Sequence, residues 1–360
     1  MDTGILSYGV YIPRHRVAVK DIWQVWQNVT PDIFDRMSLC ERAVLLPDED
    51  TITLAVAAAQ QALERSALQA SEVDALILGT CTNPYDTKAS VTVIGDALGL
   101  PGNAISFDLQ FGTKSGTAAL LAGTALVESG FARHALVIAA DTLCRHTPPG
   151  VQMEYSASAA AVAFLLGKAN VAVRLEGFAC YNQDLSDYFR LAGDRYIRLG
   201  GGWLGYISNW GLLECLVPAA RALFAKLDAD GNAYDAVCLH HPNGLAPMMV
   251  AGQLGLDLLC VMPYVFTPQV GNTGSASALL GLAHFLDYAE PGQRVLVGSY
   301  GYGAGADCLS FATTDLVVAN QGFRDLVSEQ MEKKTMLDYA SSLKSEFKLM
   351  RPPDLLTNYL

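Results

Sequence analysis

The sequence lacks closely spaced cysteine pairs, long uncharged apolar runs and an excess of basic residues. Its eight cysteines are scattered and form no Cys-x-x-Cys pair, which argues against a zinc site or a disulfide framework and suits a reducing cytoplasm. No apolar run reaches ~18 residues without a charge, so no segment is expected to cross a membrane. With 24 Lys and Arg against 36 Asp and Glu, the net charge of −12 would repel nucleic acid and anionic membranes. We therefore expect a cytoplasmic protein that binds neither nucleic acid nor membrane.

Several catalytic and cofactor motifs are also absent. The sequence contains no Gly-x-Ser-x-Gly nucleophile elbow and no His-Glu-x-x-His helix. The glycine-rich segment 298–305 has neither the Lys-Ser/Thr of a phosphate loop nor the spacing of a dinucleotide fingerprint. We interpret this segment as backbone that shapes the floor of a pocket, and we predict no cofactor and no metal ion.

The chain repeats itself in its second half. Segments 74–78, 110–113 and 135–138 match segments 235–239, 269–272 and 295–298, in the same order and at nearly one offset. Three weak matches at one offset indicate a duplicated unit. Each half alternates strand patterns with helices, which is typical of a layered α/β fold. We predict an N-terminal half at 1–170, a C-terminal half at 171–315 and a helical tail at 316–360.

In each half, one predicted helix is rich in small residues and apolar on nearly all sides. Such helices are expected to be buried between layers rather than at the surface. Their small residues would let the two helices approach closely. The predicted product is a five-layer arrangement with pseudo-twofold symmetry, and its site lies where the two helix starts converge.

The two helix starts and one strand end carry the candidate site residues. The first start places Thr113 where exposed N–H groups would lower the pKa of a thiol, although a threonine hydroxyl does not ionise near neutral pH. The second start carries Asn272, whose amide would either orient a bound carbonyl or water or simply cap the helix. His240 and His241 end the predicted strand 235–239 on opposite faces, so they cannot bind one metal ion together. For His240, a functional and a structural role stay open.

The motifs at 4–13, 240–243, 271–273 and 299–305 resemble those of the archaeal type of hydroxymethylglutaryl-CoA synthase. More broadly, they resemble the thiolase superfamily, including ketoacyl-acyl-carrier-protein synthase III. This resemblance implies an α/β thiolase fold, in which two duplicated βαβαβαββ halves form five α-β-α-β-α layers.

The resemblance also implies roles for four positions, and two of those roles are unfilled. Family members use a Cys at the first central helix, a His in the His-x-Pro-Asn motif, an Asn at the second helix and, in the synthase, a Glu after an early strand. His240 and Asn272 match the His and the Asn, whereas Thr113 stands at the Cys position and Cys81 at the Glu position. Thr113 as a nucleophile with His240 as its base, and Cys81 as a relocated nucleophile, remain as alternatives. A covalent nucleophile is normally worth several orders of magnitude in rate, so a synthase reaction of the family type is not expected.

A narrower resemblance concerns the synthase-like subunit of the bacterial phloroglucinol acetyltransferase complex, and it rests on segments 41–45, 47–50 and 111–117. It implies a non-catalytic scaffolding subunit in a complex that moves acetyl groups between acylphloroglucinols, forming carbon–carbon bonds without CoA in polyketide antibiotic biosynthesis. The implied partners are a thiolase-like catalytic subunit with an intact Cys and a small zinc-ribbon/OB-fold subunit.

Two other functions compete with the scaffold. One is an active acyl-thioester or decarboxylating enzyme of the ketoacyl synthase III type, in which His240 and Asn272 stabilise an enolate without covalent capture. The other is a binding module that senses an acyl ligand.

Two further expectations concern the surface. By analogy with the fold, we expect a dimer formed along an edge strand. In the tail, the near-helical spacing of apolar residues in segment 333–349 predicts docking either on the body or on another subunit.

Overall fold

A computed structural model describes residues 2–66, 68–200, 209–303 and 305–349. Its main feature is a nine-stranded sheet in the order β11-β12-β13-β8-β1-β7-β6-β4-β5. In chain order these strands are β1 (Gly4–Tyr11), β4 (Ala75–Gly79), β5 (Ile105–Leu109), β6 (Ala135–Thr142), β7 (Ala159–Gly167), β8 (Val173–Asn182), β11 (Ala236–Leu239), β12 (Arg294–Gly301) and β13 (Gly305–Thr313). β1 and β8 join the two halves of the sheet through only two residue pairs, Gly4 with Arg174 and Ile5 with Val173.

The two halves of the sheet are built alike, which confirms the predicted duplication. β4 pairs with β6 in parallel, and β6 pairs with β7 antiparallel. In the second half, β11 pairs with β12 in parallel, and β12 pairs with β13 antiparallel. The buried strands are rich in Val, Ile, Leu and Ala on both faces, as parallel sheets covered on both sides require.

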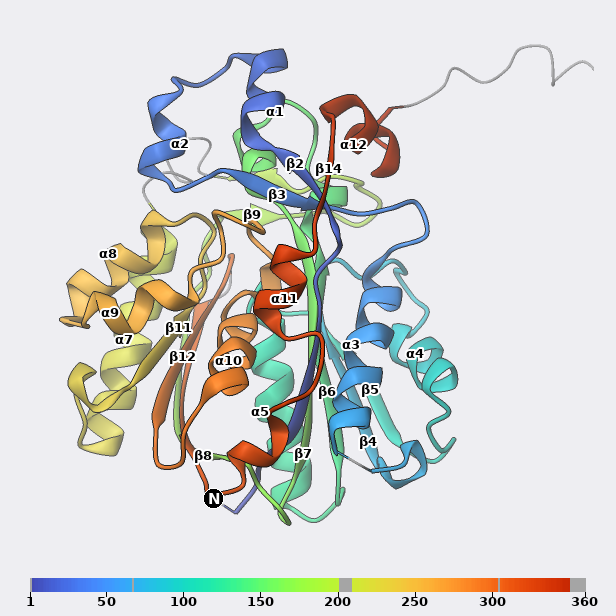
Figure 1. Cartoon of the computed structure of the whole chain (residues 1–360), viewed down its shortest axis with the longest axis vertical. Helices are drawn as coiled ribbons and strands as arrows, with labels where there is room; N and C mark the ends of the chain where they lie inside the picture. Colours follow the sequence, from blue (N-terminus) through green and yellow to red (C-terminus); the bar gives the residue numbers. More distant parts are fainter. Residues whose placement is uncertain (1, 67, 201–208, 304, 350–360) are drawn as a thin grey trace, which may run out of the picture.

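Helices cover both faces of each half, and two of them lie in the middle (Figure 1). The outer helices of the first half are α3 (Thr51–Ser66) and α4 (Ser90–Leu98), and those of the second half are α7 (Trp210–Leu227), α8 (Leu245–Leu254) and α9 (Leu258–Val261). The central pair is α5 (Ser115–Glu128) and α10 (Ser277–Tyr288), packed on β6 and β11 respectively. The predicted five-layer α/β thiolase fold is confirmed.

The starts of the two central helices approach closely because residue 116 is a glycine. A Cβ atom on Gly116 of α5 would lie 2.5 Å from the carbonyl oxygen of Ser275, just before α10. Any larger residue at 116 would push the helix starts apart. This contact confirms the predicted role of small residues at the centre of the fold.

A smaller layer lies above the carboxyl end of β6 and the amino end of β7 (Figure 1). It holds the sheet β14-β2-β3 and three helices around it. Its elements are β2 (His15–Ala18), α1 (Val19–Trp26), α2 (Asp32–Arg36), β3 (Glu41–Val44), β14 (Thr335–Leu337) and α12 (Tyr339–Ser345). The remaining elements are the hairpin strands β9 (Tyr188–Phe189) and β10 (Arg198–Leu199), helix α11 (Val327–Glu332) and the 3-10 turns η1 (Ala70–Glu72), η2 (Leu143–His146), η3 (Gln152–Tyr155), η4 (Gly231–Ala233), η5 (Met262–Tyr264), η6 (Gly274–Ala276) and η7 (Val317–Asn320).

The tail differs from the spacing that predicted it. Leu337 lies in β14, where it pairs with Val17 of β2, and the helix begins only at Tyr339. The segment docks on the body of its own chain, through a buried ion cluster formed by Arg42, Glu154, Glu346 and Lys348. Residues 350–360 of the predicted tail lie outside the described residues.

Candidate active site

The structure brings two of the four candidate residues around one backbone oxygen and places a third beside them. The carbonyl oxygen of Tyr300, near the end of β12, accepts hydrogen bonds from Thr113 Oγ1 and from His240 Nδ1, both at 2.7 Å. The Nε2 atom of His240 lies 3.2 Å from Asn272 Oδ1. The predicted convergence of the two helix starts therefore exists, and His240 lies between them.

Thr113 has no arrangement that would activate it as a nucleophile. Its hydroxyl donates to the Tyr300 carbonyl and accepts from the Tyr302 N–H at 3.3 Å. A hydroxyl nucleophile needs a base that takes its proton, and here the proton is directed at a carbonyl oxygen. The His240 ring donates to the same oxygen and offers Thr113 no lone pair.

His240 is arranged as a neutral base. Its Nδ1–H donates to Tyr300, which leaves the lone pair on Nε2. Burial lowers the pKa of His240, and this effect outweighs the hydrogen bonds from its ring to Tyr300 and Asn272, which favour the charged form. The imidazole is thus neutral at physiological pH, and a proton taken at Nε2 would find the Asn272 oxygen as its acceptor.

Asn272 leaves one donor unused. Its Oδ1 accepts from the Gly274 N–H at 3.0 Å, and this bond fixes which way the amide points. Its Nδ2 is fully buried and has no hydrogen-bond partner among the described residues. An unpaired buried donor is costly, so such a group commonly marks the place of a missing ligand atom. The Asn272 oxygen therefore holds the turn that precedes η6, whose N-cap is Thr273, and its nitrogen is a donor without a partner among the described residues. Its predicted role toward a bound carbonyl or water stays a prediction.

Cys81, at the carboxyl end of β4, is a poor candidate nucleophile. Its thiol donates to Asp141 Oδ2 at 3.2 Å. Burial, and then the charge of Asp141, raises the pKa of Cys81 well above its usual value. Since the thiolate is the reactive form, this thiol stays protonated and unreactive.

Asp141 is an organising residue that sequence reasoning missed. Its Oδ1 accepts from the backbone N–H of Cys81 and from the hydroxyls of Thr80 and Thr82, each at 2.8 Å. Its Oδ2 accepts from the Ser275 N–H at 2.7 Å. This one carboxylate fixes the end of β4 against the start of the second central helix. A signal was present, because Asp141 is the first charged residue after the apolar run of β6.

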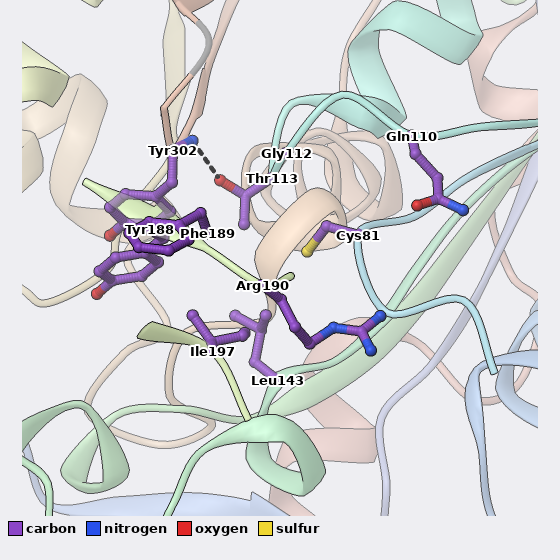
Figure 2. A pocket seen from close by; sticks show the side chains of 10 residues that line it. All are labelled: Cys81, Gln110, Gly112, Thr113, Leu143, Tyr188, Phe189, Arg190, Ile197 and Tyr302. Atoms are coloured by element: carbon purple, nitrogen blue, oxygen red, sulfur yellow. Dashed lines mark hydrogen bonds between the residues drawn. The ribbon is translucent and has the colours of Figure 1, made fainter. Parts of the chain in front are cut away.

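A cavity of about 240 Å³ opens beside Thr113 (Figure 2). Tyr188 and Tyr302 stack on one side of it with ring centroids 3.6 Å apart. Cys81 and Arg190 lie on the other side. The full lining is Cys81, Gln110, Gly112, Thr113, Leu143, Tyr188, Phe189, Arg190, Ile197 and Tyr302.

His240 and Asn272 adjoin this cavity without lining it. Both are fully buried, and the His240 ring packs edge-on against Tyr302 at 5.6 Å between centroids. Tyr302 belongs to the glycine-rich segment predicted to shape a pocket, and it forms part of the wall. The lining residues 188–197 follow no motif, so the sequence offered no signal for them.

His241 takes no part in this site. Its Nδ1 lies 2.9 Å from Thr267 Oγ1, on the other side of the strand from the Tyr300 carbonyl. Burial, and then the neighbouring His240, lowers the pKa of His241 to about 3. Among the described residues, no group of three His, Cys, Asp or Glu side chains is placed to hold a metal ion.

No protein-family model matches the chain. Curated relatives match it over nearly its whole length. The hydroxymethylglutaryl-CoA synthase of Methanopyrus kandleri is 35% identical over 346 residues, which cover 96% of this chain and 97% of that protein. The synthase of Methanothermobacter thermautotrophicus is also 35% identical, over 96% of this chain and 99% of its own length. The chain belongs to the hydroxymethylglutaryl-CoA synthase family.

Solved structures agree with this membership at the level of the fold. MvaS in complex with 3-hydroxy-3-methylglutaryl coenzyme A superposes with a TM-score of 0.80 at 23% identity, over 98% of this chain and 94% of that one. The 3-oxoacyl-[acyl-carrier-protein] synthase III of Aquifex aeolicus superposes with a TM-score of 0.78 at 21% identity, over 86% and 99%.

These relatives correct the main functional expectation. Proteins that match the chain from end to end are named as synthases, which are enzymes, so the predicted non-catalytic scaffold is wrong. The competing prediction, an active enzyme of the thiolase type, is the better supported of the two. The narrower likeness to the phloroglucinol acetyltransferase subunit, and the partner subunits it implied, find no support among these relatives and stay predictions.

Across the described residues, no helix is both long and apolar enough to cross a membrane.

Proposed function

We propose that this member of the hydroxymethylglutaryl-CoA synthase family is an active enzyme that converts an acyl thioester into its enolate. His240 and Asn272 would carry the reaction without a covalent cysteine. The single observation behind this proposal is the donor on Asn272 Nδ2, which lies beside His240 and has no partner among the described residues.

The chemistry follows from those two groups. Asn272 Nδ2 donates to the thioester carbonyl oxygen, where negative charge develops. His240 Nε2 takes a proton from the carbon beside that carbonyl, and the electrons of the broken C–H bond form the enolate. The Asn272 oxygen then accepts a hydrogen bond from the new N–H. With a malonyl-type thioester, loss of carbon dioxide would give the same enolate, which His240 would reprotonate after first taking up a proton.

The family position of Thr113 fits this route. Without a thiol there, the acyl group stays on its carrier, and the helix start serves only to shape the cavity. The acyl group would enter through the cavity, past Thr113 and Tyr302, to reach the buried pair.

Hydrogen–deuterium exchange tests the proposal directly. The purified chain is incubated in D₂O with acetyl-CoA, valeryl-CoA and glutaryl-CoA, and deuterium at the carbon beside the carbonyl is followed by NMR; malonyl-CoA is followed for carbon dioxide release. We expect exchange or decarboxylation that His240→Ala abolishes. His134→Gln is the matched control, since His134 lies before β6, at the opposite end of the sheet. If no thioester exchanges or decarboxylates, the proposal is wrong.

We also propose that two copies of the chain pair along β5. This strand ends the sheet, and its first two residues, Ile105 and Ser106, are exposed. An unpaired edge with an exposed apolar residue favours addition of another strand.

A further inference from the structure

Lys114 is a buried cation at the start of α5, in a place that local structure does not favour. Its side chain is 5% exposed, and it occupies the N-cap of the helix, where no side-chain hydrogen bond among the described residues caps the backbone. N-caps prefer short polar side chains, and the helix macrodipole is unfavourable to a cation at this end. Burial of a charged group adds a further cost. Helix formation alone therefore does not explain a lysine at this position.

The partner of Lys114 belongs to the other half of the sheet. Its Nζ lies 2.8 Å from Asp307 Oδ1 in β13, and both side chains are buried. Thr117 Oγ1, one turn into α5, donates either to Asp307 Oδ2 at 2.9 Å or to the carbonyl oxygen of Lys114 at 3.0 Å. The Phe111 ring covers the ammonium group at 4.0 Å. The ion pair thus joins the start of α5, which packs on β6, to a strand of the second half.

Two glycines allow this contact between the halves. A Cβ atom on Gly301, at the end of β12, would lie 2.7 Å from Lys114 Cγ. A Cβ atom on Gly112 would lie 2.8 Å from the carbonyl oxygen of Tyr302, and the φ of Gly112 is 55°, in the left-handed region that favours glycine. The turn before α5 and the end of β12 therefore pack backbone against backbone, beside the ion pair.

The same two segments form adjoining parts of the cavity wall. Gly112 and Thr113 line the cavity from the turn before α5, and Tyr302 lines it from the segment after β12. The Tyr302 N–H donates to Thr113 Oγ1, as drawn in Figure 2, but at 3.3 Å this bond is long and weak. The pair of Lys114 and Asp307 is the stronger contact between the two segments, because both of its groups are charged.

A buried ion pair fixes geometry more than it adds stability. The desolvation of two charges offsets much of their attraction, and replacement of such a pair by apolar side chains of similar volume is often neutral or stabilising. We infer that Lys114 is a positioning residue for the entry of the acyl thioester. Its ion pair with Asp307 fixes the relative placement of Thr113 and Tyr302, past which the acyl group enters. This inference rests on the proposed function for that route, and it assigns the residue that sets the shape of the route.

A double variant separates this role from a contribution to stability. Lys114→Met with Asp307→Leu removes both charges at once, and Thr117 can donate to the carbonyl oxygen of residue 114 instead. The melting temperature should be no lower than that of the native chain, since no buried charge is left unpaired. We expect the affinity for acetyl-CoA, measured by calorimetry on the full chain, to fall about tenfold. In the exchange assay KM should rise by a similar factor, while kcat stays within about threefold.

Two single variants are the controls. Lys114→Met leaves Asp307 as a buried charge without its partner, so it should lose both stability and affinity. Arg65→Met breaks another buried ion pair, with Asp287 at 3.8 Å, and neither residue lines the cavity. This variant should lower the melting temperature and keep the affinity for acetyl-CoA within about twofold of the native value, because distant sites act independently.

Three results would overturn the inference. One is native affinity in the double variant, and another is an equal loss of affinity in Arg65→Met, which would indicate a general loosening of the chain. The third is a double variant that fails to fold, which would show that the ion pair is needed for stability.

The exchange assay reports separately on the proposed function. Weaker binding by the double variant, together with no exchange by the native chain, would support the role of Lys114 and sink only the enolate chemistry. Exchange by the native chain, with an unchanged KM in the double variant, would sink the inference alone.

Discussion

At the scale of single residues, the site is governed by which atoms are already engaged. The Thr113 hydroxyl and the His240 Nδ1–H both donate to one carbonyl oxygen, and His240 Nε2 faces the Asn272 oxygen, whereas Asn272 Nδ2 has no partner among the described residues. Sequence reasoning found these three residues because motif and helix position marked them. It could not assign their roles, because the direction of a hydroxyl proton depends on Tyr300, which lies nearly 190 residues from Thr113 in the chain.

The engaged hydroxyl predicts that Thr113 is dispensable for chemistry. Thr113→Ala removes one hydrogen bond to Tyr300, so we expect kcat/KM for deuterium exchange to stay within about threefold, whereas loss of a positioned base such as His240 costs about 10²- to 10⁴-fold. Kinetics of the two variants side by side check this. An acyl adduct on residue 113, seen by mass spectrometry during turnover, would contradict it.

Two histidines with lowered pKa values predict how stability depends on pH. Burial lowers the pKa of His146 to about 4 and that of His241 to about 3, while both would titrate near their usual value in the unfolded chain. Between these values the unfolded state binds more protons, so the free energy of unfolding falls as pH falls from about 6.5 toward 3, by up to about 1.4 kcal/mol per pH unit for each histidine.

Urea unfolding at a series of pH values measures this slope. The His146→Asn variant should lower this slope by the contribution of about one bound proton at pH values above 4. The free energy of unfolding of the variant near pH 8 is the reference. A slope unchanged in the variant would show that His146 is not buried as a neutral ring.

At the scale of elements, the sequence predicted strands and helices correctly where a local pattern determines the structure. The prediction was wrong where pairing with a distant segment determines it. The repeat at 74–78 and 235–239 lies in β4 and β11, since an apolar run bounded by turn residues needs no further information to form a buried strand. Segment 335–337 carries the same helical spacing as α12, but pairing with His15, Arg16 and Val17 makes it a strand. Such a tertiary preference has no signature in the segment itself.

The buried ion cluster predicts a large cost for breaking the tail contact. Burial alone would raise the pKa of Glu346, but Arg42 and Lys348 lower it to about 2. Glu346→Gln leaves two buried cations with Glu154 as their one carboxylate, so we expect unfolding free energy to fall by about 3–5 kcal/mol. Denaturant unfolding measures the change. Lys333→Gln, which breaks the exposed pair with Asp325, should leave the free energy of unfolding nearly unchanged.

The same tail contact extends to the cavity. Arg195 donates to the backbone carbonyl of Glu346, and Ile197, two residues along, lines the cavity. Glu346→Gln should therefore raise the KM for thioesters more than it lowers kcat. An unchanged KM in a folded variant would show that the tail stabilises the chain without shaping the site.

At the scale of the whole molecule, one sheet runs through both halves and ends in an uncovered strand. If β5 is the contact between two copies, the native chain should elute as a dimer in light-scattering chromatography. Ile105→Lys places a charge on that edge and should give monomers. Leu259→Lys, at an apolar residue that is 81% exposed on α9, is the control and should stay dimeric. A monomeric native chain would contradict the proposed pairing.

Thr113 and Asn272 occupy equivalent places in the duplicated unit. The Thr113 hydroxyl is hydrogen-bonded to Tyr300, whereas the Asn272 amide nitrogen has no partner among the described residues. Two identical chains related by a twofold axis would carry the same residue at both positions. Because the two copies are parts of one chain, each position can carry a different residue, and the centre between them is asymmetric.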